Sequence, residues 1–428
     1  MICSLHIGLN RFLLLTVGLW PYQQSKLVQF QLILFFSILT TFISFQFTTF
    51  MTSQCTPDLV INVLSSILFF FTFMIKYSCF SINTEVIKYL LEQLQHICNE
   101  LTDENEINII KQYASNAKRY TATFMLLAIV IASLLLLYPI WPCIFDILLP
   151  INETRPRPSP LFATEYFVDQ ERYFYLIILH ANAAFVIGGV AMLATATIII
   201  FYLQHACGMF RIARRITCSY RFKRAITTET LQKNSLKHKN LIYKELIYAV
   251  DMHRKAMKFS DSTISKFKVM FFLLIVAGVI CASMNFFRMF HVMYFEYNTS
   301  EFFLRLIYIV VHMSYLFAGN YLAQEVIDHN NDIFVTVYNV QWYVAPLQVQ
   351  KMILFLLQRG TKVFNLNIAG LFVGSLEGAA TVRKMSFKIC VEYEIFFKRR
   401  KIENSCFIIV IQFHNIVFHY SLFHTELT

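Results

Sequence analysis

Charged residues are scarce in this 428-residue chain, making up 15% of it, whereas a typical soluble domain carries about 25%. Hydrophobic residues reach 57%, and the mean hydropathy is +0.53. This scarcity excludes an ordinary soluble protein, although the length alone would suit two or three soluble domains. The net charge of +11 does not indicate a nucleic-acid partner, because no polar basic domain is present to hold a duplex. The composition therefore predicts a membrane protein.

Motifs of catalysis and metal binding are also missing. The sequence has no G-x-S-x-G, H-E-x-x-H, Walker A or G-x-G-x-x-G motif. None of the ten cysteines forms a C-x-x-C pair, which argues against a zinc ribbon. We therefore expect no enzymatic activity, no cofactor and no metal site. A disulfide between Cys55 and Cys143 is possible, because both fall on the same side of the membrane in the topology below. The sequence does not establish it.

A cleavable secretory signal is not indicated either. The apolar run from Phe12 to Trp20 ends at Pro21, and no small-residue cleavage site follows it. We expect residues 1–26 to form a retained cytoplasmic segment that can touch the membrane surface.

Long apolar runs, in contrast, are abundant. A helix needs about 20 apolar residues to cross roughly 30 Å of hydrocarbon. None of the runs alternates in polarity as barrel strands would. The sequence thus predicts an all-α membrane protein with seven transmembrane helices. Six clear runs and a weaker seventh lie at about residues 27–50, 58–80, 120–141, 173–203, 269–290, 302–324 and 363–387.

The distribution of basic residues predicts the orientation. With the N-terminus inside, the inner segments between these runs hold 22 Lys and Arg and the outer segments hold 3, as the positive-inside rule requires. The sequons at Asn152 and Asn298 both fall outside, where glycosylation takes place. We therefore predict a cytoplasmic N-terminus, which is the opposite of the orientation of a G-protein-coupled receptor.

Two inner segments, 83–120 and 236–268, carry apolar residues at helical spacing with charges between them. They form either solvated surface helices or extensions of the spanning helices that pack into a cytoplasmic base. Lys76 lies near the inner end of the second run, and we expect its ammonium group to reach the polar interface.

Residues 331–360 follow the sixth run on the inside. Asp332 is suited to cap a helix, and Pro346 ends the helix that begins there. A second helix, from Leu347 to Gln358, is only about 18 Å long and too short to span the membrane.

This stretch either lies flat on lipid or packs between helices and subunits, and its amide side chains favour packing. The last helix is thus predicted to be broken. Residues 326–360 form its cytoplasmic anchor half, and residues 361–387 form its membrane half.

Four stretches of the chain resemble insect odorant receptors, the seven-helix family typical of ants, bees and wasps. NYLAQEVIDHNNDIFVTVYNVQWYVAPLQVQKMILFLLQRG is similar to the cytoplasmic anchor region of that family, and RFLLLTVGLWPYQQSK to its start. LLPINETRPRPSPLFATEYFVDQERYFY resembles its second outer loop, and QHACGMFRIARRI the inner end of its fourth helix. The likeness covers roughly residues 9–386.

This resemblance implies an odorant receptor subunit of a ligand-gated, non-selective cation channel in the plasma membrane of olfactory sensory neurons. It also implies a tetramer with a shared co-receptor, in which four anchor regions pack around the axis and the seventh helices line the pore. The anchor residues would be Tyr338, Trp342, Tyr343, Pro346, Leu347 and Lys351. We expect Trp342 and Tyr343 to be buried in the cytoplasmic base. The pore residues would be Phe372, Ser375 and Ala379.

Two other classes of membrane protein fit the sequence less well. A metabotropic chemoreceptor is disfavoured by the inverted orientation. A small-molecule transporter would favour internal repeats and broken helices at mid-membrane, and no repeat is seen.

The resemblance further implies that a volatile or hydrocarbon ligand binds in an apolar pocket within the outer half of helices two to six. A pocket of this kind needs a few polar groups to orient the ligand. Depth in the membrane and side-chain chemistry select the candidates Tyr138, Trp141, Tyr175, Ile178, His180, Asn285 and Tyr308.

The end of the chain departs from the family. Arg383, Lys384 and Lys388 fall in or beside the outer membrane half, where charge is costly. The cluster KRRK, starting at Lys398, would face outside. Residues 388–428 are either a misread end or a genuinely altered terminus, and we expect the function to reside in residues up to about Ser386.

Overall fold

The computed structural model describes residues 7–23, 25–54, 56–137, 162–218, 236–296, 299–339, 342–345, 347–362, 364–368 and 372–399. Within them the regular secondary structure is helical apart from one short hairpin. The helices are α2 (Gly8–Thr16), α3 (Lys26–Phe47), α4 (Thr49–Thr52), α5 (Pro57–Ile82), α6 (Thr84–Glu100), α7 (Glu104–Leu137), α9 (Phe174–Cys218), α11 (Leu236–Lys266), α12 (Lys268–His291), η1 (Val292–Glu296), α13 (Thr299–Asn339), η2 (Trp342–Val344), α14 (Leu347–Gly360) and α15 (Leu376–Arg399).

Six helices of the described ranges are long and apolar enough to cross a membrane, which confirms the six clear runs in the sequence. Local signals fix where two of them begin. The Ser25 hydroxyl accepts a hydrogen bond from Val28 N at the start of α3, and Thr56 does the same for Leu59 N before α5, where Pro57 occupies the first turn. These six helices are α3, α5, α7, α9, α12 and α13.

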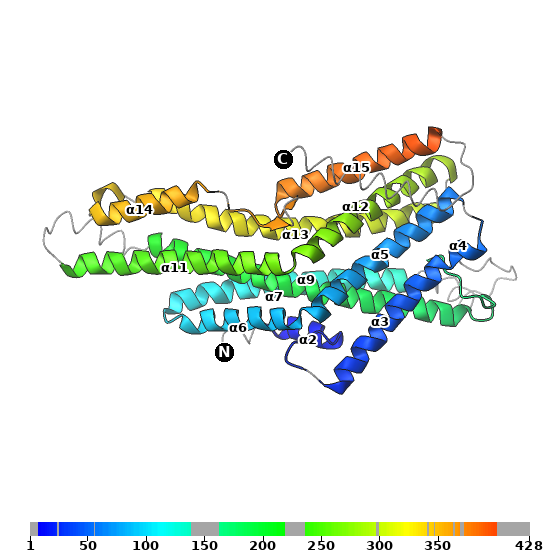
Figure 1. Cartoon of the computed structure of the whole chain (residues 1–428), viewed down its shortest axis with the longest axis horizontal. Helices are drawn as coiled ribbons and strands as arrows, with labels where there is room; N and C mark the ends of the chain where they lie inside the picture. The colour runs from blue at the N-terminus through cyan, green and yellow to red at the C-terminus, as the bar shows by residue number, and fades with distance from the viewer. Residues whose placement is uncertain are drawn as a thin grey trace.

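Three of these helices are much longer than a membrane is thick. At 1.5 Å per residue, the 45 residues of α9 extend about 68 Å, more than twice the hydrocarbon thickness. Figure 1 shows α9 and α13 running from the end that holds α4 to the end that holds α6, α11 and α14. We call this second end, including the adjoining ends of α7, α9 and α13, the base.

The base is a packed layer and not a set of solvated surface helices. Ile87, Leu90 and Leu94 on one face of α6 are buried, and the hydroxyl of Tyr202 on α9 donates a 3.2 Å hydrogen bond to Ile87 O. On the other side, 2.9 Å separates His253 Nε2 of α11 from Asn330 Oδ1 of α13. Burial lowers the pKa of His253, so its ring stays neutral at pH 7.

The expectation that Asp332 caps a helix is wrong. The helix α13 continues unbroken from Thr299 to Asn339, because no glycine or proline interrupts its sequence between the spanning part and Asn339 other than Gly319, which the helix tolerates. Asp332 Oδ2 instead accepts a 2.7 Å hydrogen bond from Arg214 Nη1 of α9, which ties α13 to α9.

The predicted second inner helix is confirmed as α14, which runs to Gly360. It buries Val349, Ile353 and Leu356 on one face. Gly360 is the last helical residue, and a Cβ atom there would lie 2.6 Å from the ring of Phe334. The glycine is therefore required by the close approach of α13.

The weak seventh run was predicted to be helical from about residue 363, and this prediction is wrong for its first part. Its first part forms the antiparallel strands β1 (Asn367–Ile368) and β2 (Phe372–Val373), and α15 begins only at Leu376. The Ser375 hydroxyl accepts from Gly378 N at 3.0 Å, and Ser375 N donates to Asn320 Oδ1 of α13 at 3.2 Å. The side chains of α13 thus fix the point at which α15 starts.

The helix α15 extends to Arg399, past the boundary placed at residues 387–388. Ile389 and Cys390 are buried, and Ile389 packs with Val382 in a cluster that includes Ile275 of α12. Residues just beyond the boundary therefore belong to the packed helix. The remainder of the atypical tail, from residue 400, lies outside the described residues.

Lys76 does not reach the polar interface as expected. Its side chain is fully buried, and Nζ lies 4.4 Å from the ring centroid of Tyr315 on α13. A cation above an aromatic face is stabilised by the ring quadrupole. The ring of Tyr315 therefore takes the place of the water that was expected to surround the Lys76 ammonium group.

Candidate ligand site

A wall of aromatic rings lies between the outer parts of α3, α5 and α9. The ring of Phe42 meets those of Phe70 and Phe162 edge to face, at centroid distances of 4.6 and 5.8 Å. Phe70 in turn contacts Phe69 and Phe73. Edge-to-face pairs of this kind are favourable beyond their buried area. We call these residues the aromatic wall: Phe42, Phe69, Phe70, Phe73 and Phe162.

His180 of α9 stands at one end of the aromatic wall, 5.6 Å from the ring of Phe42. The Thr41 hydroxyl donates to backbone carbonyls of α3 and therefore accepts from His180 Nε2 at 3.2 Å. The hydroxyl of Tyr166 then donates to Nδ1 at 2.8 Å. Both ring nitrogens are hydrogen-bonded, so His180 joins the loop before α9 to α3.

Tyr308 of α13 stands at the other end, with its ring 5.5 Å from that of Phe69. Its hydroxyl is buried and has no hydrogen-bond partner among the described residues. The same holds for Ser66 Oγ on α5 and His312 Nε2 on α13. A buried polar group without a partner costs about 1–3 kcal/mol, so the Tyr308 hydroxyl at the end of the aromatic wall indicates a place where another molecule supplies the partner.

A network of charged side chains, of which Asp58 is 41% exposed and the others are largely buried, lies beside Tyr308. The sequence analysis did not predict it. Arg288 Nη1 contacts Asp58 Oδ1 at 2.8 Å, and Arg288 Nε contacts Glu301 Oε1 at 2.9 Å. Arg305 Nη2 donates to Asn62 Oδ1 at 2.8 Å. We call Asp58, Arg288, Glu301 and Arg305 the ion network. Opposite charges at the ends of the fifth and sixth runs were the available signal, because charge within a span requires a partner.

The predicted ligand residues are only partly brought together. His180 and Tyr308 lie at the two ends of the aromatic wall, and Asn285 accepts a 3.4 Å hydrogen bond from Arg305 Nη1 of the ion network. Ile178 is buried, whereas the side chain of Tyr175 is 73% exposed and takes no part. Tyr138 and Trp141 lie outside the described residues, as do the sequons at Asn152 and Asn298 and the cysteines Cys55 and Cys143.

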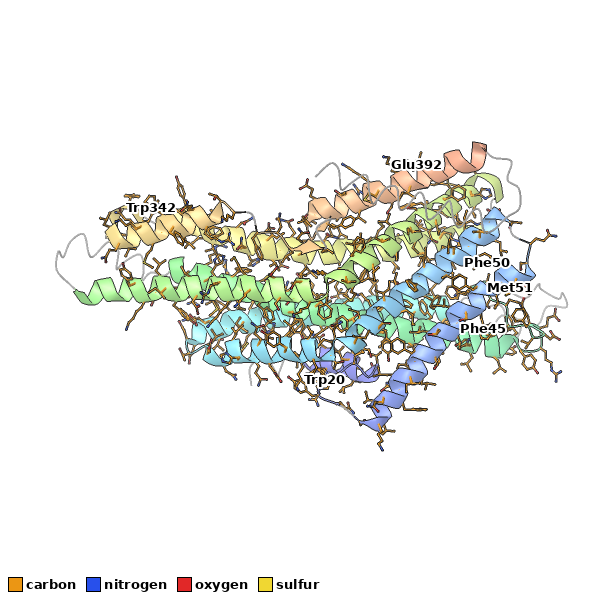
Figure 2. The ribbon with its side chains drawn as sticks, viewed as in Figure 1. Trp20, Phe45, Phe50, Met51, Trp342 and Glu392 are labelled. Atoms are coloured by element: carbon orange, nitrogen blue, oxygen red, sulfur yellow. The ribbon has the colours of Figure 1, made fainter. Side chains whose placement is uncertain are left out.

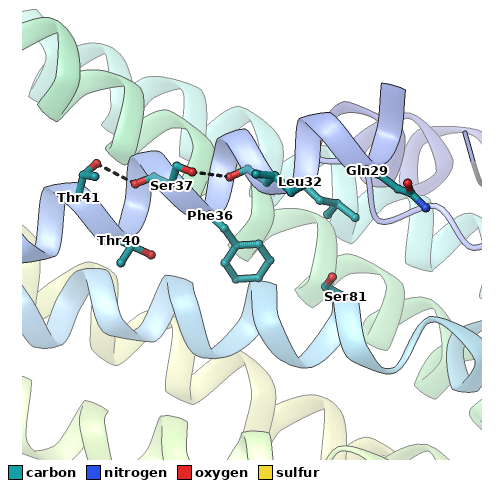
Figure 3. A pocket seen from close by; sticks show the side chains of 8 residues that line it. Gln29, Leu32, Phe36, Ser37, Thr40, Thr41 and Ser81 are labelled. Atoms are coloured by element: carbon teal, nitrogen blue, oxygen red, sulfur yellow. Dashed lines mark hydrogen bonds between the residues drawn. The ribbon is translucent and has the colours of Figure 1, made fainter. Parts of the chain in front are cut away.

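An open groove of about 790 Å³ runs along α3 toward this site (Figure 3). Phe36 and Leu32 give it an apolar floor, and the hydroxyls of Ser37 and Thr41 bind backbone carbonyls of α3. Thr41 belongs to both the groove and the surroundings of His180. The groove thus lies along one of the spanning helices and offers a largely apolar surface.

The predicted anchor residues lie at the far end of the base, and Figure 2 places Trp342 at the opposite end of the molecule from Phe45. Trp342 is half-buried, but Tyr343 is 66% exposed. The expectation that both aromatics are buried is therefore wrong for Tyr343 within a single chain. Pro346 lies outside the described residues, and exposed side chains are those of Tyr338, Tyr343, Leu347 and Lys351.

The three predicted pore residues lie on different elements. Phe372 belongs to strand β2, Ser375 caps α15, and Ala379 is in its first turn. Whether these residues face a pore stays a prediction. The reason for the misplaced helix start is long-range, because Asn320 and Gln324 of α13 receive the first backbone N–H groups of α15.

Comparisons with known proteins add to this geometry. Residues 56–387 match the sequence model of a family described as 7tm Odorant receptor. The structure of the insect olfactory receptor OR5 from Machilis hrabei in complex with eugenol has the same fold, with a TM-score of 0.71 and 15% identity over 91% of this chain and 97% of that one. A second structure of OR5 from Machilis hrabei has a TM-score of 0.68 and 16% identity, over 90% of this chain and 97% of that one. No curated protein matches the chain in sequence.

Proposed function

Because this chain belongs to the 7tm odorant receptor family, we propose that it is the odorant-binding subunit of a ligand-gated, non-selective cation channel. In this proposal it assembles with a shared co-receptor in the plasma membrane of olfactory sensory neurons. The family, the membrane-spanning helices and the fold likeness to an insect olfactory receptor support the receptor class. The channel and the co-receptor are the proposed steps beyond them.

The observation that carries the ligand site is the unpartnered hydroxyl of Tyr308 at the end of the aromatic wall. The ring of Phe69 provides apolar surface, and the Tyr308 hydroxyl offers one donor and an acceptor. A small apolar molecule with one hydroxyl or carbonyl group would satisfy this arrangement. The similar structure of OR5 from Machilis hrabei contains eugenol, which supports a small organic ligand as the class.

The exposed residues at the end of the base support the proposed assembly. Tyr338, Tyr343 and Leu347 each expose about two-thirds of their side chains, and Phe355 on α14 is 74% exposed. A continuous group of exposed aromatic and aliphatic side chains is typical of an interface between proteins. We propose that these residues contact neighbouring subunits, with α15 of each subunit facing the central pore.

The first test compares cells that express this chain with and without the co-receptor under voltage clamp. An odorant-evoked cation current should require both subunits.

Tyr343→Ser combined with Leu347→Ser should abolish co-purification and current, because the interface loses its apolar area while the single chain loses no buried contact. Tyr89→Ser, at an exposed tyrosine of α6, is the matched control and should have no effect. A G-protein-dependent response without the co-receptor would contradict the proposal.

The second test concerns Tyr308. We expect Tyr308→Phe to raise the half-maximal concentration of hydroxyl- or carbonyl-bearing activators about 5- to 10-fold, since one hydrogen bond contributes about 1 kcal/mol. Pure hydrocarbon activators should be unaffected, because the ring remains against Phe69. Concentration–response currents measure both, with Tyr175→Phe as the exposed control. Equal losses for both ligand classes would show that Tyr308 acts only in packing.

A further inference from the structure

Three metal-binding side chains meet where the spanning part of the molecule joins the base, away from the ligand site. They are Cys207 on α9 and the pair Glu325 and His329, one turn apart on α13. Their ligand atoms all lie within 4.8 Å of one another. Residues at i and i+4 project from one helix face, so α13 presents an oxygen and a nitrogen ligand together toward the sulfur ligand of α9.

The surroundings orient these groups as they would around a bound ion. His329 Nδ1 is 2.8 Å from the backbone oxygen of Glu325, which only accepts, so Nδ1 carries the proton and Nε2 keeps its lone pair. The Gln204 amide donates to Glu325 Oε2 at 2.8 Å and holds the carboxylate. Metal-ligating histidines and carboxylates are commonly fixed by such hydrogen bonds to backbone oxygens and amides.

Gln204, which holds Glu325, also has a buried polar atom without a partner. Its side chain is fully buried on α9, and its amide oxygen Oε1 has no hydrogen-bond partner among the described residues. The Tyr113 hydroxyl of α7, 2.6 Å from His329 Nε2, donates to the ring nitrogen that a metal would use. A rotation of the phenol would open that position.

We propose that Cys207, Glu325 and His329 bind a transition-metal ion, with Zn²⁺ as the best fit. One thiolate, one imidazole and one carboxylate form a mixed set that suits Zn²⁺, whereas Mg²⁺ and Ca²⁺ prefer oxygen ligands alone. A tetrahedral site places its ligand atoms about 3.5 Å apart, so the three side chains need to approach by about 1 Å. Binding releases the thiol proton of Cys207 to solvent. Glu325 and His329 are only half-buried, which gives the ion a route from solvent.

The bound ion would clamp α13 to α9 immediately beside the contact that starts α15. Gln324, the neighbour of Glu325, accepts a hydrogen bond from Leu376 N, the first residue of α15. A clamp at Glu325 would therefore restrict the segment of α13 that positions α15. An effect on current follows only if the proposed channel function holds, whereas metal binding itself does not depend on it.

The direct test is Co²⁺ binding to the full-length chain purified in detergent. Cobalt bound to a thiolate gives a near-ultraviolet charge-transfer absorption band, and we expect this band to appear at one equivalent and to be displaced by Zn²⁺. Cys207→Ser should abolish the band, and Glu325→Gln and His329→Gln should each weaken binding at least about tenfold. Cys98→Ala, at a buried cysteine of α6, should leave the band unchanged.

A second measurement protects the test against a variant that fails to fold. Zn²⁺ should raise the thermal unfolding temperature of the original chain and not that of Glu325→Gln, whose metal-free unfolding temperature should be near the original. The proposal is wrong if no thiolate–cobalt band forms. It is also wrong if Cys207→Ser and Glu325→Gln respond to Zn²⁺ as the original chain does.

Discussion

Replacing Arg288 by alanine is expected to destabilise the receptor by about 3 kcal/mol, the lower end of the cost of breaking a buried charge pair, because Glu301 is 20% exposed and keeps its contact with Arg305. Only 6% of the Arg288 side chain is exposed, and its Nε and Nη2 atoms bind the two carboxylate oxygens of Glu301 at 2.9 and 3.2 Å. The same guanidinium reaches Asp58 of α5. Its loss therefore separates α5, α12 and α13 at their outer ends.

The measurement is the thermal inactivation temperature of the detergent-purified chain together with its level at the cell surface. Arg288→Lys keeps the charge but loses the bidentate contact with Glu301. Its inactivation temperature should therefore lie between those of the original chain and the alanine variant. Arg172→Ala, at an exposed arginine, should cost little. If Arg288→Ala leaves the inactivation temperature unchanged, the ion network does not hold these helices together.

Replacing Tyr202 by alanine should have an effect of similar size in the base. Its side chain is fully buried, and its ring meets Phe259 of α11 edge to face at 6.0 Å. Truncating a buried aromatic side chain to alanine costs about 3–5 kcal/mol. The hydroxyl, which donates to Ile87 O of α6, accounts for about 1 kcal/mol of this.

Tyr202→Phe should therefore lose only a small part of the stability, and the difference between the two variants isolates the ring. Limited proteolysis of α6 and α11 reports on the base separately from the spanning helices. We expect faster cleavage there in Tyr202→Ala and not in the control Tyr89→Ala, whose side chain is exposed. Equal cleavage rates in all variants would show that Tyr202 does not join these helices.

Most of the membrane topology could be predicted from the sequence, and the candidate site only in part. Hydropathy adds up along the chain, so each of the six spans is visible without knowing its neighbours. Depth in the membrane and side-chain chemistry predict His180 and Tyr308 as candidates. They do not predict the aromatic wall that lies between these two residues. The phenylalanines of α5 are too numerous for the sequence to show which of them face α3 and which face α13.

The fold class, the six apolar spans and the amphipathic helices of the base can be predicted from the sequence alone, because each depends on residues that are close in the chain. The tertiary structure decided which polar groups in the membrane have partners, as with Lys76 over Tyr315 and Arg288 between Asp58 and Glu301. It also decided that α15 starts at Leu376, where amide groups of α13 receive its first N–H groups. These features depend on contacts between helices far apart in the chain. The sequence shows that a charge within a span needs a partner, but not which residue provides it.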